Sequence, residues 1–213
     1  MDNLIKVLLV EDDPFWNECL ADYIKREKDI ELVATATTRE EAILIAKDTK
    51  LDVVLMDIML SENNLDGIDA AMEILSINNT KIIMLTNLTE SEVVVEAFTA
   101  GAFNYLLKTN YKEIPNAIRS AYSNQSYIQS RAAEVLRNEL VRMKKEERKR
   151  LLTNVEKEIL KQIKQGNTIK EIAQKNYKTE QTIKNQLTKI LKKLGVKSSK
   201  EAVHKAKKIE LIE

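Results

Sequence analysis

Residues 53–57 have the sequence VVLMD, four apolar residues followed directly by an aspartate. A continuous apolar run of this length is typical of a strand that is buried on both faces of a parallel sheet. Two other runs have the same character: Ile5–Val10, which leads into Glu11–Asp12, and Ile82–Leu85, which leads into Thr86. We therefore expect three central strands, each ending at a polar side chain.

Amphipathic segments with helix start signals separate these runs. Asp13 can cap a helix whose first residue is Pro14, Thr38–Glu41 and Thr89–Glu92 fit the capping-box pattern, and Gly101 is a stop signal. The weaker strand candidates are Ile30–Thr37 and Tyr105–Leu107. Five strands alternating with five helices in about 120 residues predict a flavodoxin-like α/β fold with a doubly wound, five-stranded parallel sheet.

Charge divides the chain in two. Residues 1–130 carry 11 Lys/Arg and 22 Asp/Glu, and residues 131–213 carry 23 and 11, so net charges of −11 and +12 are hidden in a total of +1. Such a basic half is a candidate for nucleic-acid binding, although basic helices are often only solvated faces. The single cysteine excludes an internal disulfide, and the apolar runs are too short for a membrane span or a signal peptide. We expect a cytoplasmic protein without a membrane partner.

The second half of the chain is helical in pattern throughout. The pattern of residues 125–150 predicts a helical linker, which is either a solvated helix or a self-association surface. The pattern of residues 151–213 predicts a four-helix domain. The linker stripe consists of Ala132, Leu136, Leu140 and Met143. Helix start signals in the domain are Thr153–Glu156, Thr168–Glu171, Thr179 and Ser198–Glu201. The spacing at 168–194 suggests a helix-turn-helix.

Polar side chains follow four of the expected strands. In a parallel sheet, ligands bind beyond the carboxyl ends of the strands, so Glu11, Asp12, Asp57, Thr86 and Lys108 would meet in one crevice. Clustered carboxylates are suited to Mg²⁺, and a lysine beside them suits phosphoryl transfer to an aspartate nucleophile, here Asp57. Strand-end carboxylates without any chemistry are the simpler alternative.

Five ordered motifs in the first half resemble the receiver domain of two-component response regulators. The motifs are VLLVEDD (Val7–Asp13), LMDIML (Leu55–Leu60), LDG (Leu65–Gly67), IIMLT (Ile82–Thr86) and AGAFNYLLK (Ala100–Lys108). The resemblance covers roughly residues 4–123 and implies a receiver domain at 1–124. It also implies that Asp57 accepts a phosphoryl group from a histidine kinase.

The resemblance further implies the roles of the surrounding residues. Mg²⁺ (or Mn²⁺) would be held by Glu11, Asp12, Asp57 and the backbone carbonyl of Met59. Lys108 would contact the phosphoryl group, and Thr86 and Tyr105 would form a switch pair. The protein would not be an enzyme beyond self-phosphotransfer and autodephosphorylation on Asp57.

The chain departs from the receiver pattern near Asp57. Ser61 replaces a usual proline, the interval from Asp57 to Gly67 is longer than usual, and Asn87 is bulkier than the usual residue. A longer loop Ser61–Leu65 is therefore expected. Phosphatases of the haloacid dehalogenase type also use an aspartate nucleophile, but Met59 stands where their acid/base aspartate would be.

The basic half resembles the LuxR-type DNA-binding domain of the NarL/FixJ group. The motifs are LTNVEKEIL, KEIAQKNYKTEQTIKNQLTKILKKLGVKS and EAVHKA, within about residues 151–206. The resemblance implies binding to double-stranded DNA, with groove contacts from Lys184, Asn185 and Thr188. The full set of expected DNA-contacting residues is Thr179, Gln181, Thr182, Lys184, Asn185, Thr188, Lys189 and Lys192.

The combined expectation is a DNA-binding response regulator that dimerises when phosphorylated and regulates transcription. Two alternatives remain open at this point. The chain could be a DNA-binding regulator controlled by partner or ligand binding to the receiver without phosphorylation, or an interaction adaptor whose basic domain binds no DNA.

Overall fold

The computed structural model of the 213-residue chain describes residues 4–61, 65–125 and 128–212. It divides into two compact units, an N-terminal unit Met1–Asn138 and a C-terminal unit Glu139–Glu213. The division falls inside a long helix, α6 (Ser130–Leu151), and therefore within the segment 125–150 that the sequence assigns to a linker. In the part of the chain that the structure describes, no helix is both long and apolar enough to cross a membrane.

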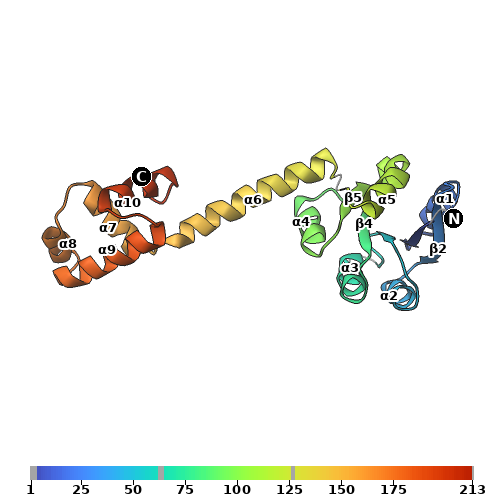
Figure 1. The fold of residues 1–213 in the computed structure, drawn as a ribbon, viewed down its shortest axis with the longest axis horizontal. Coiled ribbons are helices and arrows are strands. Elements are labelled where there is room, and N and C mark those ends of the chain that lie inside the picture. The colour runs from blue at the N-terminus through green and yellow to red at the C-terminus, as the bar shows by residue number, and fades with distance from the viewer. Residues whose placement is uncertain (1–3, 62–64, 126–127, 213) are drawn as a thin grey trace. The chain divides into compact units, whose positions relative to one another are not determined.

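A five-stranded parallel sheet, counted over the described residues, forms the centre of the N-terminal unit (Figure 1). The strands follow the spatial order β2-β1-β3-β4-β5, which confirms the predicted doubly wound fold. They are β1 (Ile5–Val10), β2 (Ile30–Ala36), β3 (Val53–Met56), β4 (Lys81–Thr86) and β5 (Asn104–Leu107). All four residues of β3 are buried, as expected for a central strand covered on both faces.

Helices cover both faces of the sheet, and each face has its own hydrophobic cluster (Figure 1). One face packs against α2 (Arg39–Asp48), α3 (Asp66–Ile77) and α4 (Ser91–Thr99). The other face packs against α1 (Pro14–Ile24) and α5 (Ile114–Tyr122), and a short 3-10 helix, η1 (Lys108–Glu113), joins β5 to α5. Apolar cover on both faces leaves the ends of the strands as the place for polar chemistry.

The predicted helix start signals are confirmed in α1, confirmed in part in α2 and wrong in α4. In α2, Thr38 caps the helix, but the Glu41 carboxylate accepts the N–H of Thr37 and not that of Thr38. The Asp13 carboxylate accepts the backbone N–H groups of Phe15 and Trp16, with Pro14 as the first residue of α1. Thr89 does not cap α4, because the Glu90 carboxylate accepts the Thr89 N–H at 2.8 Å and Glu90 itself takes the N-cap position. The helix consequently begins at Ser91.

The start of α3 lies against the end of β3. A Cβ added at Gly67 would lie 1.9 Å from the carbonyl oxygen of Asp57, so only glycine allows this approach. The carboxylate of Asp66 accepts the N–H of Leu60 at 2.9 Å and the hydroxyl of Ser61 at 2.6 Å. These contacts fix the backbone that carries Asp57.

The first part of α6 belongs to the N-terminal unit. Ala132 is 4% exposed and shares a hydrophobic cluster with Val94 and Ala97 of α4. Further along the predicted stripe, Leu140 and Met143 are 64% and 57% exposed. The stripe is therefore covered at its N-terminal end by the α4 region and open at its C-terminal end.

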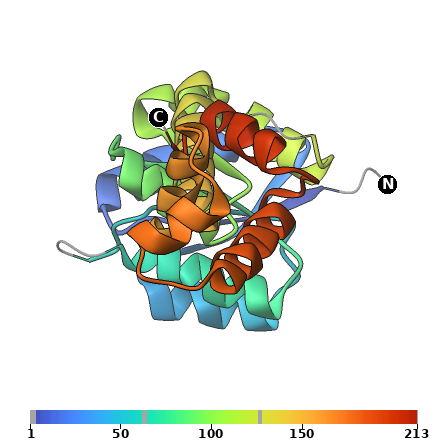
Figure 2. The same ribbon diagram turned by 90° about the vertical axis from the view of Figure 1, so that its left-hand side faces the viewer.

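The C-terminal unit is a bundle of short helices around one hydrophobic cluster (Figure 2). The helices are α7 (Asn154–Lys164), α8 (Ile169–Lys175), α9 (Glu180–Leu194) and α10 (Ser199–Lys208). Both predicted capping boxes, at Thr153 and Thr168, are present, and Gly195 ends α9 with φ of 61°. Ion pairing adds to the packing, since Lys193 Nζ lies 2.7 Å from the Glu156 carboxylate and joins α9 to α7.

Candidate functional site

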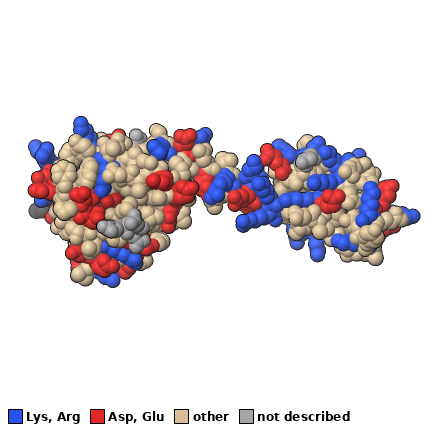
Figure 3. Space-filling model, turned by 180° about the vertical axis from the view of Figure 1, so that it is seen from behind, with Lys and Arg blue, Asp and Glu red and all other residues tan. Residues whose placement is uncertain are grey.

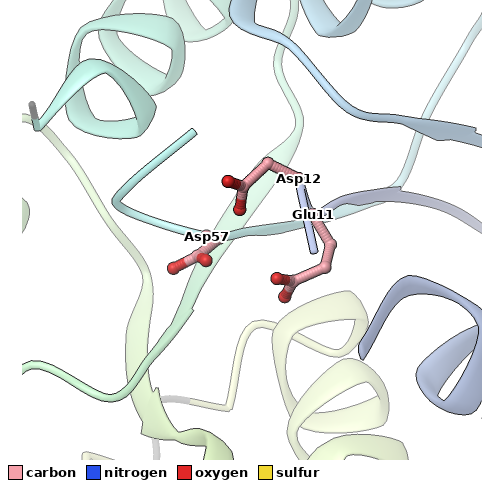
Figure 4. Close-up of side chains that lie close together, drawn as sticks. All are labelled: Glu11, Asp12 and Asp57. Atoms are coloured by element: carbon pink, nitrogen blue, oxygen red, sulfur yellow. The ribbon is translucent and has the colours of Figure 1, made fainter. Parts of the chain in front are cut away.

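Three carboxylates lie together at the carboxyl edge of the sheet. Glu11 and Asp12 follow β1 and Asp57 follows β3, and these two strands are direct neighbours. One ligand oxygen from each side chain lies within 4.8 Å of the others (Figure 4). The crevice predicted from the strand ends is thus confirmed as a place where these three side chains meet.

Lys108 completes the cluster from the end of β5. Its Nζ lies 2.7 Å from Oε1 of Glu11 and 2.8 Å from Oδ2 of Asp57. Lys108 and Asp57 are only 4% and 5% exposed, and Glu11 is fully buried. Burial alone would lower the pKa of Lys108, but its hydrogen bonds to the two carboxylates hold that pKa above its ordinary value.

The cluster holds more negative charge than Lys108 neutralises. Burial is the largest effect on Glu11 and raises its pKa to about 7, while the Lys108 ammonium works in the opposite direction. Oε2 of Glu11 is also buried, and it accepts no hydrogen bond from the residues that the structure describes. The unbonded Oε2 of Glu11, together with the nearby carboxylates of Asp12 and Asp57, forms a donor set that fits a hard divalent cation such as Mg²⁺.

Trp16 is a contact that the sequence did not reveal. The ring packs on the hydrophobic cluster beside α1. The Lys108 Nζ also lies 5.7 Å from the centre of the indole ring, within the range of a cation–π interaction. The contact joins residues that are far apart in the chain, and no local pattern in the sequence signals it.

Thr86 and Tyr105 are connected through the backbone of Leu88. The Leu88 N–H donates to Oγ1 of Thr86 at 3.2 Å, and the Tyr105 hydroxyl donates to the Leu88 carbonyl at 3.0 Å. Both side chains are buried, at 2% and 3% exposure, and burial raises the pKa of Tyr105. A movement of Thr86 would therefore be transmitted to Tyr105 through the backbone of Leu88.

Three residues that the sequence singles out near the site follow β3 or β4 in the chain. Met59 is half-buried, and Ser61 and Asn87 are exposed. The predicted longer loop Ser61–Leu65 includes residues 62–64, which lie outside the described residues.

Helix α9 of the C-terminal unit presents the polar residues that the sequence singles out. All of them are exposed: Thr179, Gln181, Thr182, Lys184, Asn185, Thr188, Lys189 and Lys192. Their opposite face is apolar, with Ile183, Ile190 and Leu194 buried in the bundle. Among these residues the hydrogen bonds are local, as from the Gln181 amide to Oδ1 of Asn185 at 3.0 Å. Lys and Arg predominate over the C-terminal unit on the side drawn in Figure 3, whereas Asp and Glu gather on the N-terminal unit.

Two family descriptions match the chain, one for each unit. Residues 7–119 match the response regulator receiver domain, and residues 150–206 match the luxR family of bacterial regulatory proteins. The response regulator protein VraR of Staphylococcus epidermidis is 34% identical over 202 residues, which are 93% of this chain and 94% of that protein. VraR of Staphylococcus aureus is 35% identical with the same coverage.

Solved structures agree with this assignment. A LuxR-family two-component response regulator from Aurantimonas sp. SI85-9A1 is 27% identical, with a TM-score of 0.59 over 65% of this chain and 99% of that one. The RcsB response regulator of Salmonella typhimurium has the same fold, with a TM-score of 0.57, 18% identity and coverage of 95% and 97%. The acidic strand-end cluster, the helical basic unit and these matches agree, and the chain belongs to the two-component response regulators with a LuxR-type DNA-binding domain.

Proposed function

We propose that Asp57 accepts a phosphoryl group from a histidine kinase or a small phosphodonor. In this step a carboxylate oxygen of Asp57 forms a bond to phosphorus while the bond from phosphorus to the donor breaks, which yields an acyl phosphate. The observation that carries the proposal is the buried Asp57 carboxylate with the Lys108 ammonium 2.8 Å away. Lys108 can stabilise the negative charge of the phosphoryl group during transfer. We propose no enzymatic activity for the protein beyond this self-phosphotransfer and the loss of the phosphoryl group by hydrolysis.

The carboxylates beside Asp57 support dependence on a divalent cation. Glu11, Asp12, Asp57 and the backbone carbonyl of Met59 would hold Mg²⁺ or Mn²⁺, and the orphan Oε2 of Glu11 supports this assignment. When bound, the ion offsets phosphoryl charge. Lys108, by its ion pairs, keeps Glu11 and Asp57 close together in the meantime.

The link through Leu88 provides a route from Asp57 to the surface. A phosphoryl group adds about −1.5 to −2 charges and three strong acceptors, and a Thr86 hydroxyl that turns toward them changes its contact with the Leu88 N–H. The backbone of Leu88 can then shift, and with it the Tyr105 hydroxyl that donates to the Leu88 carbonyl. Helix α4 and the covered end of α6, where Ala132 packs, are the region that would respond.

The output is binding of double-stranded DNA by α9, followed by regulation of transcription. Lys184, Asn185 and Thr188 would contact base edges, with Gln181 beside them. The remaining exposed residues would contact phosphates; they are Thr179, Thr182, Lys189 and Lys192. Phosphorylation would favour a homodimer, whose two DNA-binding units bind half-sites about 34 Å apart more tightly than one. A solved structure that describes RcsB dimers bound to DNA supports this arrangement.

The functional division follows the sequence-based domains. We place phosphorylation in residues 1–124, signal transmission in the linker 125–150 and DNA binding in residues 151–213, in a protein that acts in the cytoplasm.

The test of phosphorylation is the intact-protein mass after incubation with acetyl phosphate and Mg²⁺. We expect a gain of about 80 Da in the wild type and none in Asp57→Ala. Asp69→Ala, an exposed aspartate of α3, is the matched control and should behave as the wild type. A gain in Asp57→Ala would place the phosphoryl group elsewhere, whereas no gain in any form, with duplex binding intact, would favour a regulator that does not depend on phosphorylation.

A further inference from the structure

The turn between α8 and α9 contains an unusual tyrosine. Tyr177 has φ of 51°, in the left-handed region, and its side chain is 98% exposed. A bulky residue in this conformation is strained relative to glycine. The turn therefore places a large aromatic side chain in solvent on a backbone that favours glycine.

The comparable residues of the chain show that Tyr177 is the unusual one. The other non-glycine residues with positive φ in the described ranges are Asn124, a residue type that tolerates this conformation, and Glu210, which pairs with Lys145 at 3.8 Å. Within the described part of the chain, the Tyr177 ring and hydroxyl have no hydrogen bond, aromatic contact or cation–π contact; only its backbone N–H is bonded, to Gln174 at 3.2 Å. The side chain of Tyr177 thus adds little to the stability of the folded unit.

The position of Tyr177 places it beside the DNA-binding helix. It stands two residues before Thr179, which caps the N-terminus of α9 by accepting the Thr182 N–H at 3.1 Å. Lys175, just before the turn, and Lys178, within it, are exposed. When the N-terminal part of a recognition helix enters the major groove, the preceding turn comes close to the sugar-phosphate backbone. Tyrosine hydroxyls are established donors to phosphate oxygens.

We propose that the Tyr177 hydroxyl donates a hydrogen bond to a DNA phosphate at the edge of the groove. The turn 176–178 is then part of the DNA-binding surface and holds α9 in register along the duplex. This inference rests on the proposed DNA binding by α9 and adds a contact from outside that helix.

The decisive variant is Tyr177→Phe, which removes only the hydroxyl. Because phosphate contacts do not depend on base sequence, a random-sequence duplex of about 30 base pairs is a suitable probe for the full-length protein, with and without acetyl phosphate. We expect Tyr177→Phe to weaken binding roughly tenfold, since its hydroxyl bonds a charged group. The slope of log affinity against log salt should stay unchanged, because no positive charge is lost. Tyr122→Phe, in the partly exposed C-terminal turn of α5, should leave the affinity unchanged.

A second variant separates binding from stability. Tyr177→Gly relieves the left-handed backbone, so its melting temperature should be no lower than that of the wild type while its affinity for the duplex falls at least as far as in Tyr177→Phe. Wild-type affinity in Tyr177→Phe would overturn the inference. So would a melting temperature of Tyr177→Gly clearly below that of the wild type, because its loss of affinity would then reflect a loss of stability. Failure of the wild type to bind the duplex at low salt would instead contradict the DNA-binding function itself.

Discussion

The two units carry their functional side chains in opposite ways. In the N-terminal unit, Glu11, Asp57 and Lys108 are buried and bonded to one another. In the C-terminal unit, the residues of α9 proposed to contact DNA are exposed, and the hydrogen bonds that the structure describes for them are local, as from Thr188 to the Lys184 carbonyl at 3.0 Å. One site is assembled from strands far apart in sequence, whereas the other is the open face of one helix.

The difference has an energetic consequence. Buried charges must be paired or they destabilise the fold, so the residues proposed for phosphorylation also determine the stability of their unit. Exposed side chains on α9 keep their hydration and can be exchanged with little effect on folding. Variants in the two sites should therefore differ in stability as well as in function.

The largest effect on stability is expected for Lys108→Met. This change leaves two buried carboxylates without their shared cation and should lower the free energy of unfolding by about 3 kcal/mol, measured by urea denaturation without divalent ions. Arg119→Met is the matched control, because Arg119 pairs with Asp29 at 2.7 Å but is more exposed. It should lose about 1 kcal/mol or less, and equal losses in the two variants would break the contrast between buried and exposed charge.

An effect on stability that depends on pH is expected at Glu11. Its pKa is raised to about 7 in the folded protein, above the value of about 4.3 in an unfolded chain, so the folded state binds more protons between these values. The free energy of unfolding of the metal-free wild type should accordingly fall as pH rises through this window. Glu11→Gln should lack this decline.

The same Glu11 variant sharpens the assignment of the cation site. Mg²⁺ at neutral pH should raise the melting temperature of the wild type, because it binds only the folded cluster, and should raise that of Glu11→Gln much less. Glu41→Gln serves as the control, since Glu41 is an exposed carboxylate of α2 whose pKa is lowered by hydrogen bonds from Thr37. An equal response to Mg²⁺ in all three proteins would remove Glu11 from the cation site.

The smallest effect on stability is expected for Lys184→Ala on α9. The melting temperature should stay within about a degree of the wild type, because an exposed side chain is removed from a helix that alanine favours. Affinity for duplex DNA should fall, and if Lys184 also neutralises a phosphate the salt slope should fall by about 0.9. A clear decrease in melting temperature would show that exposed residues of α9 contribute to the stability of the fold, and it would weaken the contrast between the units.

Periodicity and capping patterns predicted most of the fold. The strands Ile5–Val10 and Val53–Met56 have the predicted bounds, and the meeting of Glu11 and Asp57 follows from strand order alone. The capping box predicted at Thr89 was wrong. It requires the Glu92 carboxylate to accept the Thr89 N–H, whereas the Glu90 carboxylate accepts this N–H in the structure.

Contacts between distant elements are beyond such patterns. The indole of Trp16 near Lys108 depends on how α1 packs against the end of β5, which no local signal encodes. The same holds for the bond from Tyr105 to the Leu88 carbonyl, since it requires the register between β4 and β5 as well as the path of the loop after β4.

Hydrogen bonds at the start of α3 make the position of Asp57 independent of the number of residues between Ser61 and Leu65. Gly67 donates its N–H to the Ile58 carbonyl at 3.0 Å, and Asp66 holds Leu60 and Ser61, so both ends of the interval are fixed by bonds close to Asp57. The entropy of closing a loop changes only slowly with its length. Extra residues inserted between Ser61 and Leu65 should therefore leave the bonds of Asp66 and Gly67 in place, which makes this interval of the sequence a suitable place to insert a short peptide tag or a fluorescent label.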